Sequence, residues 1–326
     1  LSSTAGKVAR PCTAIRVQNS LEANVIFVPF FSSLSYNKHS KIRENANATR
    51  DGILQEKLVQ FLLVQKEWKR NGGKDHLIVA HHPNSLLYSR KNLASAMFVL
   101  GDFGRYPAEI ANLRKDMIAP YRHVVKGVHL LESATFDRRP ILAYFQGAIH
   151  RKDGGVIRQM LYRQLRDERD VHFAFGNIRK NGIEKAGQGM ESSKFCLNIA
   201  GDTPSSNRLF DAIATLCVPV IISDEIELPF EDAIDYSEFC VFVRAAEAVQ
   251  PGELLRRLRG IGELEWTKMW KKLKEIAPGF EYRYPSEAGD AVDMIWQALS
   301  RKLSSPHDPN VNRKRRYRHS QVPVTS

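Results

Sequence analysis

Short apolar runs alternate with helix-patterned segments along almost the whole chain, and this alternation constrains the fold most strongly. Strands that alternate with helices are typical of α/β layers with a parallel sheet, because each helix returns the chain to the start of the next strand. The first series has three strand-like runs and one helix with an apolar face of Leu54, Leu58, Phe61, Leu62 and Trp68. We expect strands at 25–31, 76–80 and 96–100, and a helix at 49–68.

A second and longer series follows a polar stretch near residue 135. It predicts strands at 140–145, 171–175, 195–199, 218–222 and 239–243, helices at 156–165, 183–191 and 204–216, and a last helix at 288–302. We therefore expect two Rossmann-like domains that face a cleft, with C-terminal helices that close the fold. The predicted boundaries are 1–136, 137–262, 263–303 for the closing helices, and 304–326 for a basic flexible tail. Ligands of such sheets bind outside the carboxyl ends of the strands, so the loops there are the first places to search.

The charge of the chain is strongly positive but unevenly distributed. Lys and Arg number 48 and Asp and Glu number 36, which gives a net charge of +12. The last 26 residues hold seven of the basic residues against one Asp, a net +6. Half of the excess therefore lies in the tail, and the rest favours an anionic ligand. Binding to nucleic acid is supported only by this charge, and we do not expect a nucleic-acid partner.

Four cysteines are few for a chain of this length. Cys196, Cys217 and Cys240 lie in or beside apolar runs, where we expect buried free thiols. No apolar run approaches the ~20 residues that a membrane helix needs.

The segment after the predicted strand 195–199 has the composition of an anion-binding loop. Gly201 permits a tight turn, Thr203 is a good helix N-cap, and Pro204 suits the first helical position. Hydroxyls of Ser205 and Ser206 lie beside the first amides of the helix, where the helix dipole favours phosphate. The other interpretation is that the loop only starts a helix.

One turn into the predicted helix, Arg208 can contact phosphate oxygens, and Asp211 can accept hydrogen bonds from ribose hydroxyls. Alternatively, the two side chains pair with each other. Arg151, Lys152 and Arg158 follow the first strand of the second series and can add positive charge at the same sheet edge, or can form a solvated basic face. The chain has no P-loop, no Gly-x-Gly-x-x-Gly and no Asp-x-Asp, so phosphoryl transfer, dinucleotide binding and a metal-bridged diphosphate clamp lose support.

Long stretches of the sequence resemble the exostosin family, glycosyltransferase family 47. The matching segments are 193–213, 218–224, 226–232, 28–31, 73–76, 116–120 and 144–147, and the resemblance extends over 21–302. Segments 32–36, 80–85 and 102–106 look most like the plant branch of pectic arabinan arabinosyltransferases. The resemblance implies a GT-B fold and inverting, metal-independent transfer from a UDP-sugar to a polysaccharide acceptor, with no cofactor.

The same resemblance implies a Golgi location with type II topology. Family members carry an N-terminal membrane anchor and stem, which this chain lacks, and the first strand of the acceptor-side domain is expected to be missing. Assembly with itself or with other Golgi transferases is open.

The resemblance assigns site residues by position. The diphosphate would be held by Arg208 and the loop, and Asp211 would replace the acidic ribose ligand, which is more often Glu. Carboxylates after the strand 218–222 would bond the hydroxyls of the transferred sugar. These assignments cover Gly201, Asp202, Thr203, Ser205, Ser206, Asp224, Glu225 and Glu227.

An inverting transfer needs a base to take the proton of the acceptor hydroxyl. The candidates follow strands of the first domain: His81, His82 and Asp102. Many relatives have His-Asp where this chain has His82-Pro83, so the family pattern is broken there. His82 can instead order its loop, and Asp102 can be structural.

Two further hypotheses remain open. The broken pattern also fits a non-catalytic partner subunit that keeps the nucleotide fold. The donor can instead carry xylose, galactose or glucuronic acid, because the pockets for such sugars differ by a few hydroxyl contacts.

Overall fold

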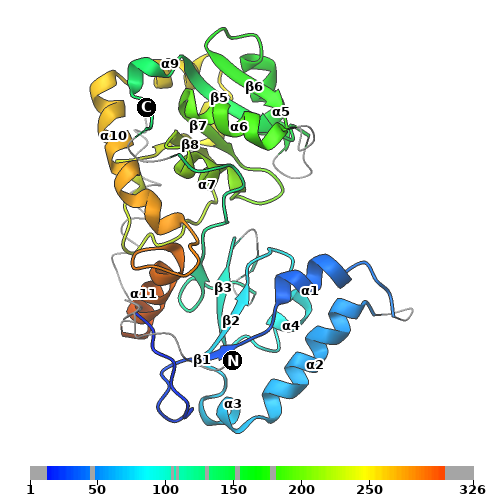
Figure 1. Ribbon diagram of the computed structural model, residues 1–326. Helices are drawn as coiled ribbons and strands as arrows, with labels where there is room; N and C mark the ends of the chain where they lie inside the picture. The colour runs from blue at the N-terminus through cyan, green and yellow to red at the C-terminus, as the bar shows by residue number, and fades with distance from the viewer. Residues whose placement is uncertain are drawn as a thin grey trace, which may run out of the picture.

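Two separate parallel sheets form two domains, one above the other in Figure 1. The computed structural model describes residues 13–44, 48–103, 106–107, 110–128, 132–150, 155–176 and 181–304. The predicted α/β fold with two Rossmann-like domains is confirmed, and this is the architecture of the GT-B type. The predicted basic tail lies outside the described residues beyond Ser304.

The N-terminal domain is built on a sheet of four strands in the order β1-β2-β3-β4, all parallel. Helices α1 and α2 cover one side of the sheet in Figure 1. The elements are β1 (Ile26–Val28), α1 (Ser32–His39), α2 (Arg50–Val64), α3 (Lys66–Asn71), β2 (His76–Ala80), α4 (Leu87–Arg90), β3 (Met97–Leu100) and β4 (Met117–Ile118).

The predicted helix at 49–68 is two helices, α2 and α3. Thr49 caps α2, because its side chain accepts a hydrogen bond from the amide of Gly52. Leu58, Leu62 and Trp68 are buried as expected, but Phe61 is 61% exposed, so its place in the apolar face was wrong.

The C-terminal domain has a five-stranded parallel sheet in the order β6-β5-β7-β8-β9. Its strands are β5 (Ile141–Gly147), β6 (Val171–Phe175), β7 (Ser193–Ile199), β8 (Val218–Ile222) and β9 (Val241–Phe242). The helices among them are α5 (Gly155–Leu165), α6 (Gly182–Glu191) and α7 (Asn207–Ala214), followed by α8 (Ala245–Ala248) and α9 (Glu253–Gly260). Short 3-10 turns occupy Phe136–Arg138, Tyr236–Glu238 and Ala277–Phe280.

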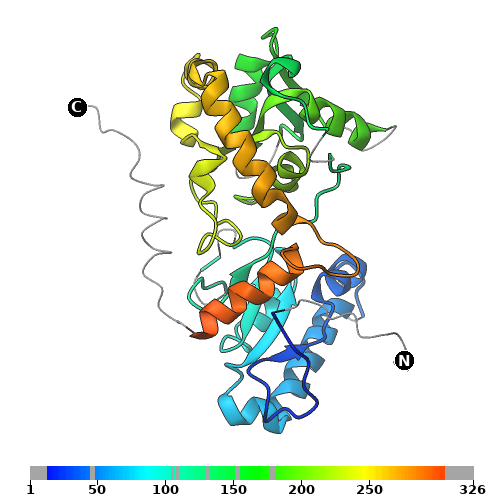
Figure 2. The same ribbon diagram turned by 60° about the vertical axis from the view of Figure 1, so that its left-hand side comes forward.

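The two long C-terminal helices pack on different domains. Helix α10 (Glu263–Ile276) packs on the C-terminal domain, where Trp266 is fully buried and its indole N–H donates to the carbonyl of Lys194 at 2.9 Å. Helix α11 (Ala291–Ser304) returns to the N-terminal domain, and Figure 2 shows it across that sheet. The ammonium of Lys302 donates to the carbonyl of Leu113, close to β4. The core is accordingly continuous between the domains: Met117 of β4 and Leu299 of α11 belong to one buried cluster with the C-terminal sheet.

Candidate functional site

The loops at the carboxyl ends of the two sheets meet, as the parallel topology predicted. Asp102 follows β3, and its Oδ2 accepts a hydrogen bond from the backbone N–H of Ser205, which follows β7, at 3.0 Å. Asp102 is 2% exposed and Ser205 is 5% exposed. The structure therefore brings a predicted base and the predicted anion-binding loop into direct contact.

Hydroxyl groups fix the loop from both of its sides. Ser206 Oγ donates to Asn198 Oδ1 of β7 at 2.7 Å, and Ser223 Oγ, after β8, donates to the carbonyl of Pro204 at 2.8 Å. Thr203 Oγ1 donates to the carbonyl of Ser205 at 2.9 Å. The loop is thus held in one shape by the strands on both sides of it.

The predicted start of the following helix was wrong. Helix α7 begins at Asn207 with Ser206 in the N-cap position, not at Pro204 with Thr203 as the cap. The hydroxyls of Thr203 and Ser206 are used within the loop and toward β7, and the amide of Ser205 is used by Asp102. Residues 201–206 are therefore not helical, and α7 begins only after Ser205, the residue that contacts Asp102.

Two arginines lie against the same aromatic ring at the end of β5. The guanidinium carbons of Arg208 and Arg158 lie 5.0 Å and 5.5 Å from the ring centroid of Phe145. Glycines make room for both. A Cβ at Gly147 would lie 2.1 Å from Arg208 Nη2, and a Cβ at Gly201 would lie 2.6 Å from Arg158 Nη2.

The two arginines have different surroundings. Arg158 is 2% exposed and donates to the carbonyls of Ala148, Ile199 and Ala200 at 2.6–3.0 Å, so it ties the ends of β5 and β7 together. Arg208 is half-buried, and its Nε donates to the carbonyl of Gln146 at 3.0 Å. Arg208 therefore suits direct contact with an anion, whereas the geometry of Arg158 is that of a residue that positions the loop. Arg151 lies outside the described residues.

Asp211 is buried on the inner side of α7. Its Oδ1 accepts hydrogen bonds from the amides of Val124 at 2.7 Å and Val125 at 3.3 Å, in the segment that links the two sheets. Burial raises the pKa of this carboxyl, and the two backbone donors oppose the rise. Asp211 thus joins helix α7 to the linker, and its contact with ribose stays a prediction.

The two histidines after β2 have different partners. His81 is largely enclosed, and its Nε2–H donates to the carbonyl of Pro120 at 3.1 Å, edge-on to Tyr121. The Nδ1 of His82 accepts from the amide of Asn84 at 3.2 Å, and its ring lies 4.6 Å from that of Tyr36. Burial lowers the pKa of both imidazoles, so both are neutral at neutral pH.

The carboxylates after β8 lie mainly at the surface. Asp224 Oδ1 accepts from the amide of Ala245 at 3.0 Å, which caps the short helix α8. Glu225 and Asp202 are exposed, and Glu227 is partly buried. Their contacts with a donor sugar stay predictions.

Two cysteines predicted as free thiols form a disulfide, so that prediction was wrong for them. Cys196 in β7 is joined to Cys217, which directly precedes β8, whereas Cys240 is buried and free as expected. Because β7 and β8 are adjacent strands, the two sulfurs meet. The disulfide encloses the 201–206 loop and α7 within a covalent ring.

Asn198 and Gly147 were missed as candidate site residues. Asn198 is 1% exposed, and its Nδ2 is buried without a hydrogen-bond partner in the described part of the chain. An amide side chain within the otherwise apolar run 195–199 was the available signal. No comparable signal marked Gly147, because its role depends on Arg208 from a distant segment.

Most of the sequence matches a known protein family. The Exostosin GT47 domain family matches residues 4–258. The chain belongs to this family. It therefore carries a glycosyltransferase domain.

Two curated plant relatives, both from Arabidopsis thaliana, have related printed functions. The chain is 41% identical over 290 residues to "Probable arabinosyltransferase ARAD1", covering 89% of this chain and 64% of the relative. It is 25% identical over 316 residues to "Probable glucuronoxylan glucuronosyltransferase IRX7", covering 89% of this chain and 67% of the relative. The chain thus spans about two thirds of the length of these proteins.

Solved structures are more distant. A "Glycosyltransferase from Rickettsia africae ESF-5" matches with a TM-score of 0.43 and 10% identity, over 81% of this chain and 84% of that one. The "pneumococcal O-GlcNAc transferase GtfA in complex with UDP and GlcNAc" matches with a TM-score of 0.39 and 10% identity, over 79% and 60%.

Membrane-spanning helices and metal-binding clusters are both absent from the described ranges. None of the helices there is both long and apolar enough to cross a bilayer. Nor do three His, Cys, Asp or Glu side chains gather there in a way that could hold a metal ion.

Proposed function

We propose that this domain transfers a pentose, arabinose, from a UDP-sugar to a cell-wall pectic polysaccharide, with inversion at the transferred carbon. The observation that carries the proposal is the contact of Asp102 with Ser205, which joins the loop after β3 to the loop after β7 beside Arg208. The 41% identity to "Probable arabinosyltransferase ARAD1" supports arabinose as the donor sugar.

Arg208 and the first amides of α7 would neutralise the leaving diphosphate. A guanidinium forms strong, charge-assisted hydrogen bonds with phosphate, and a helix N-terminus adds partial positive charge. Arg208 is held in place by the carbonyl of Gln146 and by the face of Phe145. In this proposal the protein supplies the charge that a metal ion supplies in other transferases.

Asp102 is the best candidate for the base. The Nε2 of His81 carries a proton that it donates to Pro120. His82 accepts at Nδ1, so its neutral ring carries the proton on Nε2 and acts there as a donor. An ionised carboxylate only accepts, which is what removal of a proton from an acceptor hydroxyl requires.

Use of Asp102 as the base requires its bond to Ser205 to open. A sugar cannot lie between two atoms that are 3.0 Å apart. Donor binding on the loop would therefore separate the two domains at this edge and release the carboxylate toward the acceptor. His82 would then orient the acceptor hydroxyl through its Nε2–H.

The proposal is tested with a panel of UDP-sugars against arabinan, galactan and xylan acceptors, with the linkage of the product determined. We expect transfer from a UDP-pentose to arabinan. Transfer from a hexose donor only would overturn the arabinose assignment, and transfer of xylose or glucuronic acid would replace it with the donor found.

A non-catalytic partner subunit is the second candidate, because His82-Pro83 departs from the family pattern. Turnover by the purified chain alone excludes it. Turnover that appears only when a second transferase is added would support it.

The disulfide supports a place in the lumen of the secretory pathway. Such bonds persist in oxidising compartments and are rare in the cytosol. We include in the proposal a Golgi location, with a membrane anchor outside this chain, and association with itself or other Golgi transferases.

A further inference from the structure

Helix α1 buries polar side chains and exposes apolar ones. The side that faces the protein is made of serines: Ser32 is 2% exposed and donates to the carbonyl of Val79 at 2.7 Å. Ser35, 8% exposed, donates to Asp51 of α2 at 2.6 Å, and Gln55 donates to the other oxygen of Asp51 at 2.8 Å. Helix α1 is therefore attached by hydrogen bonds and not by an apolar face.

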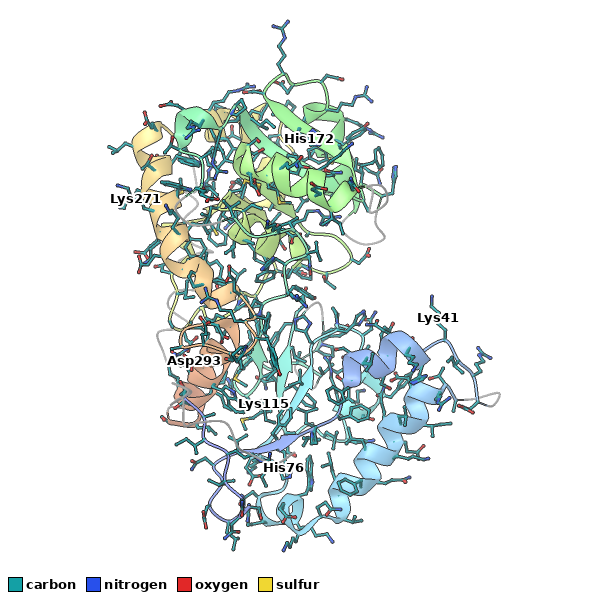
Figure 3. The ribbon with its side chains drawn as sticks, viewed as in Figure 1. Lys41, His76, Lys115, His172, Lys271 and Asp293 are labelled. Atoms are coloured by element: carbon teal, nitrogen blue, oxygen red, sulfur yellow. A yellow bond between two sulfur atoms is a disulfide. The ribbon has the colours of Figure 1, made fainter. Side chains whose placement is uncertain are left out.

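The opposite side of α1 carries the apolar residues. Phe31, at the N-cap of α1, and Leu34, within the helix, are 75% and 62% exposed. Lys38, within the helix, and Lys41, just beyond the C-cap Ser40, are exposed too. We call these four residues the α1 outer face. Figure 3 shows Lys41 at the far end of α1, on the side away from α2.

The segment that carries the α1 outer face is basic. Lys38, Lys41 and Arg43 lie within 31–43, which contains no Asp or Glu, and the exposed Glu44 that follows pairs with Arg50 at 3.7 Å. A surface helix normally buries its apolar residues and exposes its polar ones. The reverse order loses burial energy, so the exposed apolar pair next to cations is better explained by a ligand than by stability.

Helix α1 contacts the candidate site through residues that neighbour the α1 outer face in sequence. Ser33 Oγ accepts a hydrogen bond from the amide of His82 at 2.8 Å, and the ring of Tyr36 lies 4.6 Å from that of His82. A chain-like ligand that lies along α1 would therefore lead to the acceptor-side loop of the proposed reaction.

We propose that the α1 outer face binds an acidic polysaccharide acceptor. Phe31 and Leu34 would pack against the apolar faces of sugar rings near the site, and Lys38 and Lys41 would pair with uronate carboxylates farther along the chain. The inference rests on the proposed function for the nature of the acceptor. It adds where that acceptor lies, and that the arabinan to be extended is attached to a pectic chain that carries uronate carboxylates. A membrane is less suited as the partner, because an eight-residue helix with two exposed apolar side chains gives little area for insertion.

The test measures binding, so it does not depend on turnover. Affinities for an oligogalacturonide, a neutral arabino-oligosaccharide and UDP are measured by calorimetry for two double variants, Lys38→Glu/Lys41→Glu and Phe31→Ala/Leu34→Ala. Matched controls are Lys66→Glu/Lys69→Glu on α3 and Phe61→Ala on α2, which change exposed residues elsewhere in the same domain. Thermal unfolding checks that each variant is folded.

We expect the lysine variant to bind the oligogalacturonide on the order of tenfold more weakly, with a reduced dependence on salt. The Phe31 and Leu34 variant should lose affinity for both oligosaccharides. UDP binding and the control variants should be unchanged.

Oligosaccharide affinities within twofold of the parent protein in both variants would overturn the inference. So would binding of anionic phospholipid vesicles, or self-association, that depends on the same residues in place of oligosaccharide binding. If the variants lose oligosaccharide binding but no UDP-pentose is used, the proposed function fails and this inference stands. If the pentose is transferred and the variants bind normally, only this inference fails.

Discussion

Replacing Gly147 with alanine is expected to weaken UDP binding although the substitution adds a single methyl group. The new Cβ would lie 2.1 Å from Arg208 Nη2 and 2.6 Å from its Nε and Cζ, where ordinary contact starts at 3.4 Å. The guanidinium must therefore move by more than ~1 Å and give up its bond to the carbonyl of Gln146. The displaced guanidinium would lose its proposed bond to the diphosphate of UDP. One charge-assisted hydrogen bond contributes about 1.5–3 kcal/mol, so its loss corresponds to a roughly 13- to 160-fold higher Kd for UDP.

Calorimetric titration with UDP tests this on Gly147→Ala, Arg208→Ala and the double variant. Gly260→Ala is the control, because a Cβ there meets no heavy atom within 4 Å. The double variant should bind UDP no more weakly than Arg208→Ala, since both changes act on the same group. Unchanged affinity in a folded Gly147→Ala protein, or additive losses in the double variant, would refute the assignment of Arg208.

Four other outcomes are expected. Asp102→Asn keeps an acceptor for the loop amide but not a base, so turnover should fall by about 10²–10⁴-fold, whereas UDP affinity measured by calorimetry should not fall; full activity would exclude Asp102 as the base. Replacing Cys196 and Cys217 together by alanine should lower the free energy of unfolding by about 3 kcal/mol in urea, from the loss of a loop closure of 21 residues; an unchanged midpoint would show that the disulfide contributes nothing. EDTA should leave the transfer rate unchanged if Arg208 supplies the charge, and a loss restored by Mn²⁺ or Mg²⁺ would contradict this. Burial lowers the pKa of His81 and His82 below the ordinary 6.5, so these side chains take up protons more readily in the unfolded chain than in the folded one. The free energy of unfolding should therefore decline as the pH falls below about 6.5. Equal midpoints of urea unfolding at pH 7.5 and pH 5.5 would contradict this expectation.

Much of the sheet architecture was predictable from sequence, because buried parallel strands are continuous apolar runs. β2, β6 and β8 have the bounds expected from their runs. Helix α1 was not predicted from the sequence. A helix is recognised by an apolar face that it buries, whereas α1 buries serines and exposes its apolar residues. The disulfide was missed because spacing does not tell which apolar runs become neighbouring strands.

The site was predictable only to the level of the sheet edge. Parallel strands place their following loops together, so the 201–206 loop and Asp102 were both expected at carboxyl ends. Their direct contact depends on how the two domains pack, which no local pattern encodes. The start of α7 was predicted wrongly for a similar reason, because the hydroxyl groups that would cap the helix bond to other partners in the loop or in β7.

The return of α11 to the first domain has a consequence for the order in which the protein matures. Lys302 of α11 donates to the carbonyl of Leu113, in the segment before β4, and Asp293 near the start of α11 accepts hydrogen bonds from Thr13, far away in the sequence. During synthesis the second sheet can form from neighbouring strand-helix-strand units as they emerge, whereas the first sheet waits for residues 291–304 before its surface is covered. The domain made first is therefore completed last. Truncation before Ala291 should thus harm the N-terminal domain more than the C-terminal domain, whose strands directly precede the cut.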